Sequence, residues 1–296
     1  MERLLTFIRY QVLFVVLMVC GQETVEAQEA SKEMKASQKV VDNKGKISGY
    51  WRTFLMITQN EGSLKDWAAL ATGGMLKYET SRVKNFQLGV AYYTSHNLNI
   101  GDISEQDAQT NRGSRYGLGL FNVRDTDQRT IQLLGELYLK YGTPKHHLTI
   151  GRMKLKSRLM NPQDGRMIPT LEQGIWYHNQ LLPRTTIQLG WISHIAPRSF
   201  DRHLTVAESI GVYPLGRNID GTGSGYRNQL TSKGLGIAQV KFTNNIWGVE
   251  VWNYYVENIF NTLFAEVHLK GKLGGLPWKL RDKKIITFPF QNFGTV

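Results

Sequence analysis

The sequence predicts an all-β fold, namely a transmembrane antiparallel up-and-down β-barrel of the large porin type. The first observation is a set of about ten segments, each roughly ten residues long, in which apolar and polar residues alternate. Successive side chains on a strand point to opposite faces, so each segment has one apolar face and one polar face. The second observation is that short and long connections alternate between the segments. Both features are typical of a barrel that is apolar outside and polar inside.

The first 27 residues have the pattern of a Sec signal peptide. Arg3 and Arg9 lie near the start, residues 12–21 are apolar, and residues 25–27 match a cleavage site with small residues. An apolar run of about ten residues is too short to cross a bilayer as a helix, which takes about twenty. The pattern therefore predicts export through the inner membrane.

A lipoprotein signal is the alternative for this segment. It would place a lipid on Cys20, but Val19 is bulky for the position before such a cysteine. We therefore expect a signal peptide at residues 1–27, cut after Ala27. The polar and unpatterned residues 28–46 are predicted to form a periplasmic lead-in.

Composition limits the class of protein. The chain has 36 Lys and Arg against 24 Asp and Glu, and residues 1–27 hold two arginines and three acidic residues, so the mature chain carries a formal charge of +13. For an exported protein, we assign this charge to outer loops and a cation-rich lumen, and we expect no nucleic-acid partner. No cysteine follows Cys20, so backbone pairing and packing must hold the fold together. No later stretch contains eighteen consecutive apolar residues, so the sequence predicts no transmembrane helix.

The barrel region is predicted at residues 47–272. Tight turns are expected at 81–84, 143–145, 182–183 and 244–245, and long polar connections at 58–67, 96–129, 156–173 and 195–234. This sorting predicts short periplasmic turns and long outer loops. The predicted strands are 47–57, 68–80, 85–95, 130–142, 146–155, 174–182, 184–194, 235–243, 246–256 and 262–270.

Alternation also predicts which side chains face lipid. On the strand at 130–142, Ile131, Leu133, Leu137, Leu139 and Tyr141 share one face, opposite Gln132, Glu136 and Lys140. The strand at 146–155 has no clean assignment, because Leu148 and Ile150 share a face with Arg152. Aromatic residues expected at the membrane rims are Tyr50, Tyr78, Tyr92, Tyr93, Tyr141, Trp176, Tyr177, Tyr254 and Tyr255.

The segment 159–169 is predicted to be a compact loop, the third outer loop in order. Prolines at 162 and 169 restrict its backbone, and Asp164 and Arg166 place opposite charges on one turn. Here the chain resembles the OprD family of outer-membrane porins. The resemblance runs in order over residues 47 to about 270, through 49–52, 71–80, 135–141, 148–152, 161–169 and 257–261.

The resemblance implies a substrate-selective channel whose third loop folds into the barrel, and whose lumen cations guide small carboxylate-bearing solutes. It places Asp164 and Arg166 at the pore constriction. Fixed cations raise the local concentration of anions, and opposite charges across a constriction orient a zwitterion. The implied basic track is Arg52, Lys140, Arg152, Lys241 and Lys270, and the implied lumen acids are Glu136, Glu250 and Glu266. The implied partners are outer-membrane lipid and small solutes, and the implied location is the bacterial outer membrane.

Each of these residues also has a purely structural interpretation. Asp164 and Arg166 can stabilise their own turn without touching a solute. Each lumen Lys or Arg can pair with a lumen glutamate on the same solvated face.

No metal, cofactor or catalytic residue is expected. His146 and His147 are adjacent on a strand, so they face opposite sides and cannot hold one ion together. A barrel enzyme such as a lipid hydrolase is an alternative class, which needs a nucleophile beside a histidine on one face. Ser193 and His194 are adjacent, which predicts opposite faces. A secreted carbohydrate-binding β-sandwich that uses exposed Trp and Tyr is the other alternative.

Residues 273–296 fit no predicted strand and form an atypical C-terminal tail. About ten strands are fewer than the sixteen to eighteen of large porins. The hypothesis that follows is a truncated product, cut by a frameshift near Leu276, in which an incomplete sheet leaves two open edges. Family resemblance and competence as a pore are therefore separate questions. The sequence contains no signal for an oligomeric state.

Overall fold

The computed structural model describes residues 45–289, apart from residues 115, 123–129, 163–165, 214–219, 224, 226–228 and 274–275. The chain divides into two compact units, Met1–Lys46 and Ile47–Val296. The predicted signal peptide and most of the lead-in lie outside the described residues, and so does Asp164.

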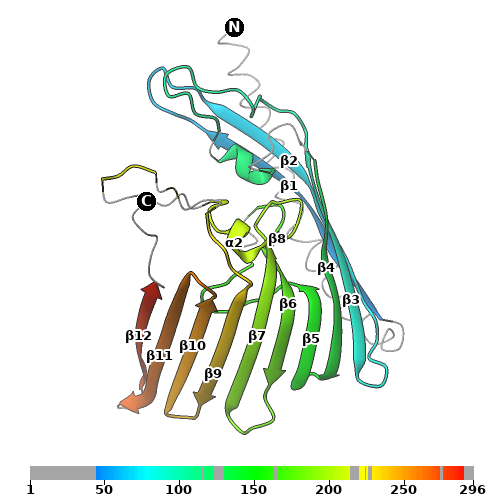
Figure 1. Ribbon diagram of the computed structural model, residues 1–296, viewed down its shortest axis with the longest axis vertical. Helices are drawn as coiled ribbons and strands as arrows, with labels where there is room; N and C mark the ends of the chain where they lie inside the picture. Colours follow the sequence, from blue (N-terminus) through cyan, green and yellow to red (C-terminus); the bar gives the residue numbers. More distant parts are fainter. Residues whose placement is uncertain are drawn as a thin grey trace. The chain divides into compact units, whose positions relative to one another are not determined.

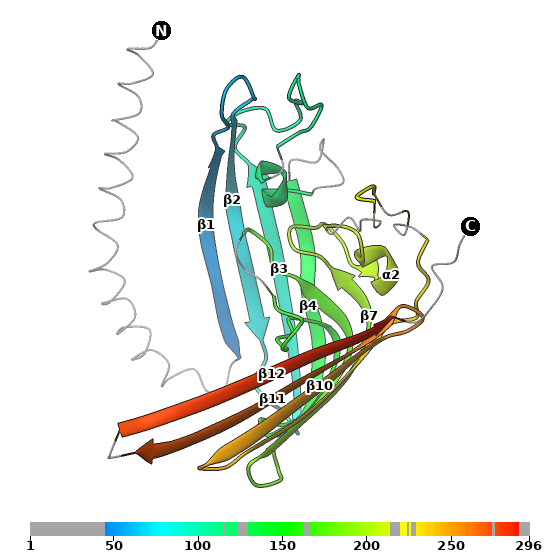
Figure 2. The same ribbon diagram turned by 90° about the vertical axis from the view of Figure 1, so that its left-hand side faces the viewer.

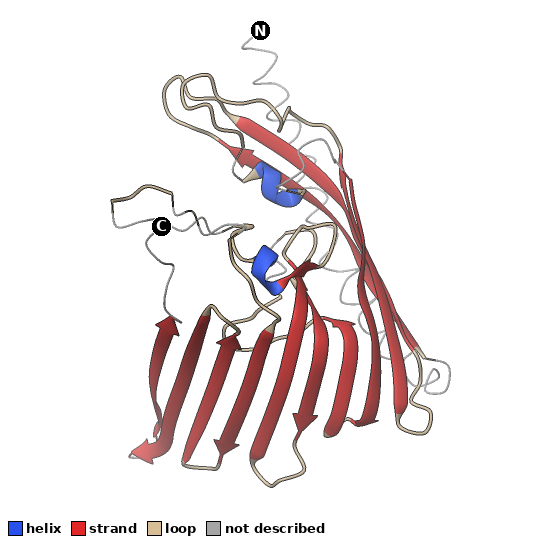
Figure 3. Ribbon diagram, in the orientation of Figure 1, coloured by secondary structure: helices blue, strands red, loops and turns tan. Residues whose placement is uncertain are grey.

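Every predicted strand forms, and in the described residues all strands join one antiparallel sheet (Figures 1 and 3). Neighbours in the sheet are neighbours in sequence, with one exception. β7 pairs with β9, and the short strand β8 between them in sequence pairs with β7 alone. The up-and-down prediction is confirmed, and the two-sheet sandwich is wrong. The strands are β1 (Lys46–Thr58), β2 (Trp67–Glu79), β3 (Phe86–Asn97), β4 (Thr130–Thr143), β5 (His146–Met153), β6 (Leu171–Asn179), β7 (Thr185–Ala196), β8 (Leu204–Thr205), β9 (Leu235–Thr243), β10 (Trp247–Val256), β11 (Phe260–Leu273) and β12 (Leu276–Pro289).

The last strand is a departure from the sequence prediction. The segment after Leu273, expected to be an atypical tail, forms β12 and pairs with β11 along its whole length. Alternation does continue there, with Leu280 and Ile286 on the same face as Leu269 and Leu263 of β11. The charged Asp282 and Lys284 lie between them on that face, and they conceal the apolar pattern.

The sheet has two faces that differ in what covers them. On one face large apolar side chains remain exposed, for example Leu139 at 45%, Leu189 at 47% and Leu269 at 39%. Chain connections cover the other face, where Tyr93 and Met167 are fully buried. We call these the outer face and the inner face. An extended array of exposed apolar residues is what a lipid-facing wall presents.

A β-bulge in β4 changes the predicted faces of that strand. The register with β3 shifts at Gly135, which is left as an extra residue. Ile131 and Leu133, predicted to face lipid, are therefore buried on the inner face, with 0% and 4% of their surfaces exposed. Leu137 is exposed on the outer face as predicted. One inserted residue reverses the alternation because side chains repeat with period two.

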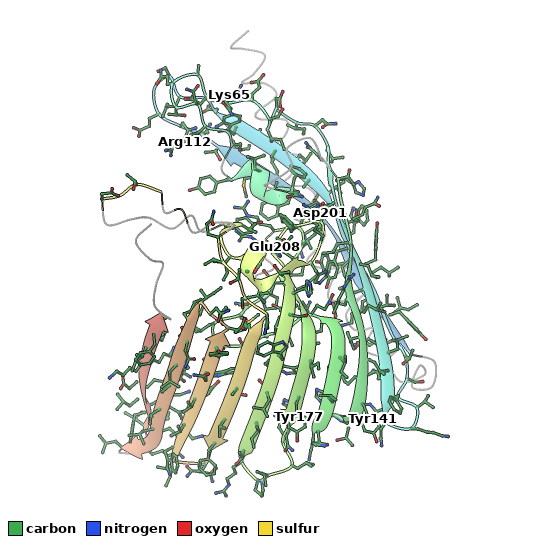
Figure 4. All side chains as sticks on the ribbon, in the orientation of Figure 1. Lys65, Arg112, Tyr141, Tyr177, Asp201 and Glu208 are labelled. Atoms are coloured by element: carbon green, nitrogen blue, oxygen red, sulfur yellow. The ribbon has the colours of Figure 1, made fainter. Side chains whose placement is uncertain are left out.

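The aromatic residues predicted at the rims divide between the two faces. Figure 4 shows Tyr141 and Tyr177 close to the turns that end β4 and β6. Tyr141 is exposed there, which suits a membrane interface. The rim prediction is wrong for Tyr93, Trp176 and Tyr254, which are buried on the inner face.

Short turns join the strands at one end of the sheet, and the longer connections lie at the other end (Figure 2). We call these the turn end and the loop end. The connection between β10 and β11, residues 257–259, lies at the loop end but is short. The 3₁₀ helix η1 (Gly117–Leu120) and the helix α2 (Val206–Ser209) belong to loop-end connections. In the part of the chain that the structure describes, no helix is long and apolar enough to cross a membrane.

Candidate functional site: the inner face and the loop that crosses it

The connection from β5 to β6, residues 154–170, crosses the inner face of the sheet. It is the predicted third outer loop, and we call it the constriction loop after the role that the family resemblance implies. One segment, residues 157–159, contacts β10, and a second segment, residues 166–168, contacts β1. We call these the first arm and the second arm. The described segments of the loop therefore lie on the inner face, and the narrowing of a pore by this loop stays a prediction.

Charge pairing anchors the first arm. Arg158 donates from Nε to Glu250 Oε1 at 3.0 Å and from Nη2 to Glu250 Oε2 at 2.6 Å. Its Nη2 also lies 3.4 Å from Glu266 Oε2. Hydrogen bonding to Glu250 raises the pKa of the Arg158 guanidinium above its ordinary value. The fork geometry makes this a charge-assisted contact of the stronger kind.

The phenol of Tyr254 holds the backbone of the same arm. Its oxygen accepts from the backbone N–H groups of Arg158 at 3.1 Å and Leu159 at 3.2 Å, and its O–H lies 2.9 Å from Ser157 Oγ. Glu250 is fixed in turn by Trp252 Nε1 at 2.6 Å. The first arm thus sits on a prearranged set of partners on β10.

Arg166 begins the second arm and is held by both its backbone and its side chain. Arg52 of β1 donates from Nη1 to the carbonyl oxygen of Arg166 at 2.6 Å. The Arg166 guanidinium donates to the carbonyl oxygen of Tyr116, just before η1. Burial, followed by the nearby Arg198, lowers the pKa of Arg166. Arg166 therefore ties its loop to the β3–β4 connection rather than to its own turn, and its place at a pore constriction stays a prediction.

Apolar packing completes the second arm. Met167 and Ile168 are fully buried in a cluster with Ala69 and Ala71 of β2 and Ala91 of β3. These alanines lie on the inner face, where their small side chains leave room for the loop. Burying whole aliphatic side chains supplies the largest stabilising contribution available here.

Glu136 of β4 has its hydrogen-bond partners on other strands of the sheet. Lys77 Nζ lies 2.7 Å from Glu136 Oε2, and Tyr93 donates to Oε1 at 2.7 Å. No residue of the constriction loop is needed for this pairing. Glu136, Glu250 and Glu266 all lie buried on the inner face, and their role as lumen acids stays a prediction.

Two members of the predicted basic track lie on the inner face beside these acids. Lys140 Nζ is 5.4 Å from the centre of the Tyr138 ring. Lys241 Nζ is 3.9 Å from Glu250 Oε2. Both positions follow from the alternation of β4 and β9.

The β11–β12 hairpin adds inner-face cations that the sequence analysis missed. Lys270, a predicted member, lies opposite Lys279 in the register. Arg281 Nε and Lys283 Nζ lie 3.5 Å and 3.8 Å from Glu266. Lys279, Arg281 and Lys283 are spaced two residues apart, as side chains on one face of a strand are. This signal is overlooked when no strand is assigned to the segment.

Arg152 lies on the outer face, so its assignment to the lumen is wrong. It borders a groove with the exposed Leu137, Ile150 and Trp191. Its Nε donates to Gln173 Oε1 at 3.0 Å, and its Nη1 donates to the carbonyl oxygen of Leu134 at 3.3 Å. Alternation with Ile150 fixes this face, and the two contacts near the end of β5 use part of the hydrogen-bonding capacity of the guanidinium.

An open pocket of about 330 Å³ lies on the inner face beside the start of the constriction loop. Four lysines and two glutamates line it, so its charge is cationic overall. We call it the lysine pocket. His147 and His178, paired across β5 and β6, stack there with ring centres 5.0 Å apart. The charged lining residues are Lys77, Glu79, Glu136, Lys140, Lys154 and Lys156.

Ser193 and His194 meet, contrary to the sequence argument about opposite faces. A bulge at Ser193 brings its Oγ to 3.0 Å from His194 Nδ1. The hydroxyl also donates to the carbonyl oxygen of Gln173 at 3.3 Å. No carboxylate pairs with His194 in the described part of the chain, so the orienting third group of a hydrolase triad is missing there. Nor do three His, Cys, Asp or Glu side chains gather for a metal among the described residues.

Comparisons of the sequence with protein-family models and with curated proteins give no match. Solved structures do match the fold. OccAB1 of Acinetobacter baumannii aligns with a TM-score of 0.58 and 14% identity, over 82% of this chain and 52% of that one. The outer membrane protein OpdK of Pseudomonas aeruginosa aligns with a TM-score of 0.56 and 16% identity, over 81% and 55%. A BenF-like porin of Pseudomonas fluorescens Pf-5 gives 0.56 and 12%, over 81% and 56%.

These matches define the class of the fold. The sheet has the fold of these porin structures, and the likeness expected from the sequence is confirmed at the level of the fold. The chain spans little more than half the length of the porin structures that it matches.

Proposed function

We propose that this chain forms the wall and constriction of an OprD-type outer-membrane channel for passive diffusion of small carboxylate-bearing solutes. The observation that carries the proposal is the constriction loop, anchored at two arms across a cation-rich inner face. The outer face of exposed apolar residues supports a lipid environment. Water-exposed cations in a narrow passage favour anions by raising their local concentration.

The lysine pocket is the proposed solute path on the turn side of the constriction loop. Lys140, Lys154 and Lys156 line it without an acidic partner within ion-pair distance among the described residues. Arg166, and Asp164 beyond the described residues, are proposed to border the narrowest point. One solved structure is of Pseudomonas aeruginosa OpdK with vanillate, a carboxylate, which supports the same solute class here.

Planar-bilayer recordings of the purified mature chain test this proposal. In the described sheet β1 and β12 are the edge strands, and unpaired strand edges are costly in lipid. Whether the chain conducts ions at all is therefore the first question that the recordings answer. We expect channels whose reversal potential in a KCl gradient shows a preference for chloride. Lys140→Gln combined with Lys156→Gln should reduce that preference, and Arg166→Ala should shift the reversal potential.

The matched control is Lys145→Gln, which removes a cation from the turn between β4 and β5, outside the pocket. Swelling of proteoliposomes in gluconate and in glucose then compares a carboxylate with a neutral solute of similar size. Equal rates would contradict the carboxylate class, and an absence of conductance would contradict the channel. A reversal potential unchanged by Arg166→Ala would remove that residue from the constriction.

A further inference from the structure

Arg152 presents unused hydrogen-bond donors on the outer face. Its two contacts engage Nε and one N–H of Nη1. An arginine has five N–H donors, so those of Nη2 are unused within the described residues. No carboxylate lies within ion-pair distance of Arg152 in the described part of the chain. A guanidinium on a lipid-facing surface is costly unless an anion accompanies it.

The surface beside Arg152 is a groove rather than a smooth wall. Its volume is about 640 Å³, and Leu134, Leu137, Ile150 and Ile175 supply its apolar sides. Gln173 and Ser193 join Arg152 as its polar lining. The groove therefore combines a shallow, open apolar surface with one positively charged group.

A second groove of about 460 Å³ continues across the outer face. It shares Ile175 and Trp191 with the first and runs over β9 and β10. Gly236 and Ala238 of β9 have at most a methyl side chain on the outer face, so a hollow remains beside the Trp191 ring. Two apolar tracks thus diverge from the same tryptophan.

We propose that the two grooves bind one phospholipid of the outer membrane. The phosphate would lie on the Arg152 guanidinium, and the acyl chains would follow the tracks on either side of Trp191. Planar guanidinium groups bind phosphate through paired hydrogen bonds. Gln173 supports this role, because its Oε1 accepts from Arg152 and its amide NH₂ then remains for a phosphate oxygen. The proposal rests on the outer-membrane location in the proposed function, but not on conductance.

Native mass spectrometry of the mature chain in dodecyl maltoside tests the site, with dioleoyl phosphatidylglycerol and dioleoyl phosphatidylcholine as probes. We expect wild-type protein to retain one phosphatidylglycerol at about a tenfold lower concentration than phosphatidylcholine, since the choline cation of the latter offsets the attraction between its phosphate and Arg152. Arg152→Gln should abolish this preference. Leu134→Trp, which fills the groove but keeps Arg152, should weaken retention of both lipids.

Lys284→Gln is the matched control, because it removes an outer-face cation on β12 that borders neither groove. Preference retained by Arg152→Gln, or lost equally in Lys284→Gln, would overturn the site. Displacement of the lipid by excess inorganic phosphate would show that a free anion is enough, which also overturns it. Wild-type protein that binds lipid but conducts no ions would contradict the channel and leave the lipid site standing.

Discussion

The two arms of the constriction loop are anchored by different forces. The first arm places Arg158 on the carboxylates of β10 and β11. The second arm buries Met167 and Ile168 among the alanines of β2 and β3. Ionic anchoring requires a few correctly oriented charged groups and is weakened by salt. Apolar packing depends on how well the side chains fill the available volume, and salt does not screen it. We therefore expect the position of the first arm, unlike that of the second, to respond to ionic conditions.

Pairing within the wall differs from pairing between wall and loop. Glu136 is satisfied by Lys77 and Tyr93, which belong to neighbouring strands. Glu250 accepts hydrogen bonds from Trp252 and Gln239 of the sheet, and also from Arg158 of the loop, which is 92 residues away in the sequence. Removal of the first pair would disturb the sheet, whereas removal of the second would release the loop and leave the sheet paired.

The largest effect is expected from the apolar arm. Ile168→Ala should destabilise the folded protein by about 2–5 kcal/mol, because it leaves a cavity under a side chain that is fully buried. Urea unfolding in detergent, followed by tryptophan fluorescence, measures the change. Ile246→Ala makes the same substitution at an exposed turn and should cost less than about 0.5 kcal/mol. Similar losses in both variants would mean that the second arm is not packed.

An intermediate effect is expected from the ionic arm. Arg158→Gln should cost about 1–3 kcal/mol, because it removes the charge-assisted bonds to Glu250. Hydrogen exchange of the Arg158 and Leu159 amides reports the docked arm directly, and wild-type protection should fall on raising KCl from about 0.1 to 1 M.

Tyr254→Phe separates charge from hydrogen bonding in the same arm. It removes the acceptor of two backbone N–H groups without changing any charge. Exchange should therefore become faster while its dependence on salt remains. Wild-type exchange that is unaffected by salt would contradict the ionic anchoring of this arm.

The smallest effect is expected at Lys283. This side chain is 50% exposed and lies 3.8 Å from Glu266, which Arg158 and Arg281 also approach. Lys283→Gln should change stability by less than about 1 kcal/mol, since solvent screens exposed pairs. The same urea unfolding measures it. A loss of stability as large as that of Arg158→Gln would mean that ion pairs within the sheet stabilise the protein as much as the ion pair between the sheet and the loop.

Much of the fold could be predicted because it depends on local pattern. The strands, their order and the exposed positions of Leu139 and Leu189 follow from period-two alternation, which each segment carries by itself. The inner-face positions of Lys140, Lys241 and Glu250 follow from the same rule. The prediction was wrong where one residue broke the period, as at Gly135 and Ser193, since a bulge is not distinguishable from the residue types alone.

The sequence by itself determined that the chain is one antiparallel sheet with an apolar and a polar face. Only the tertiary structure decided which groups meet across that sheet. The contact of Arg158 with Glu250 and the burial of Ile168 depend on the path of a long loop across distant strands. Alternation is a property of neighbouring residues, whereas these contacts join residues that only the folded chain brings together.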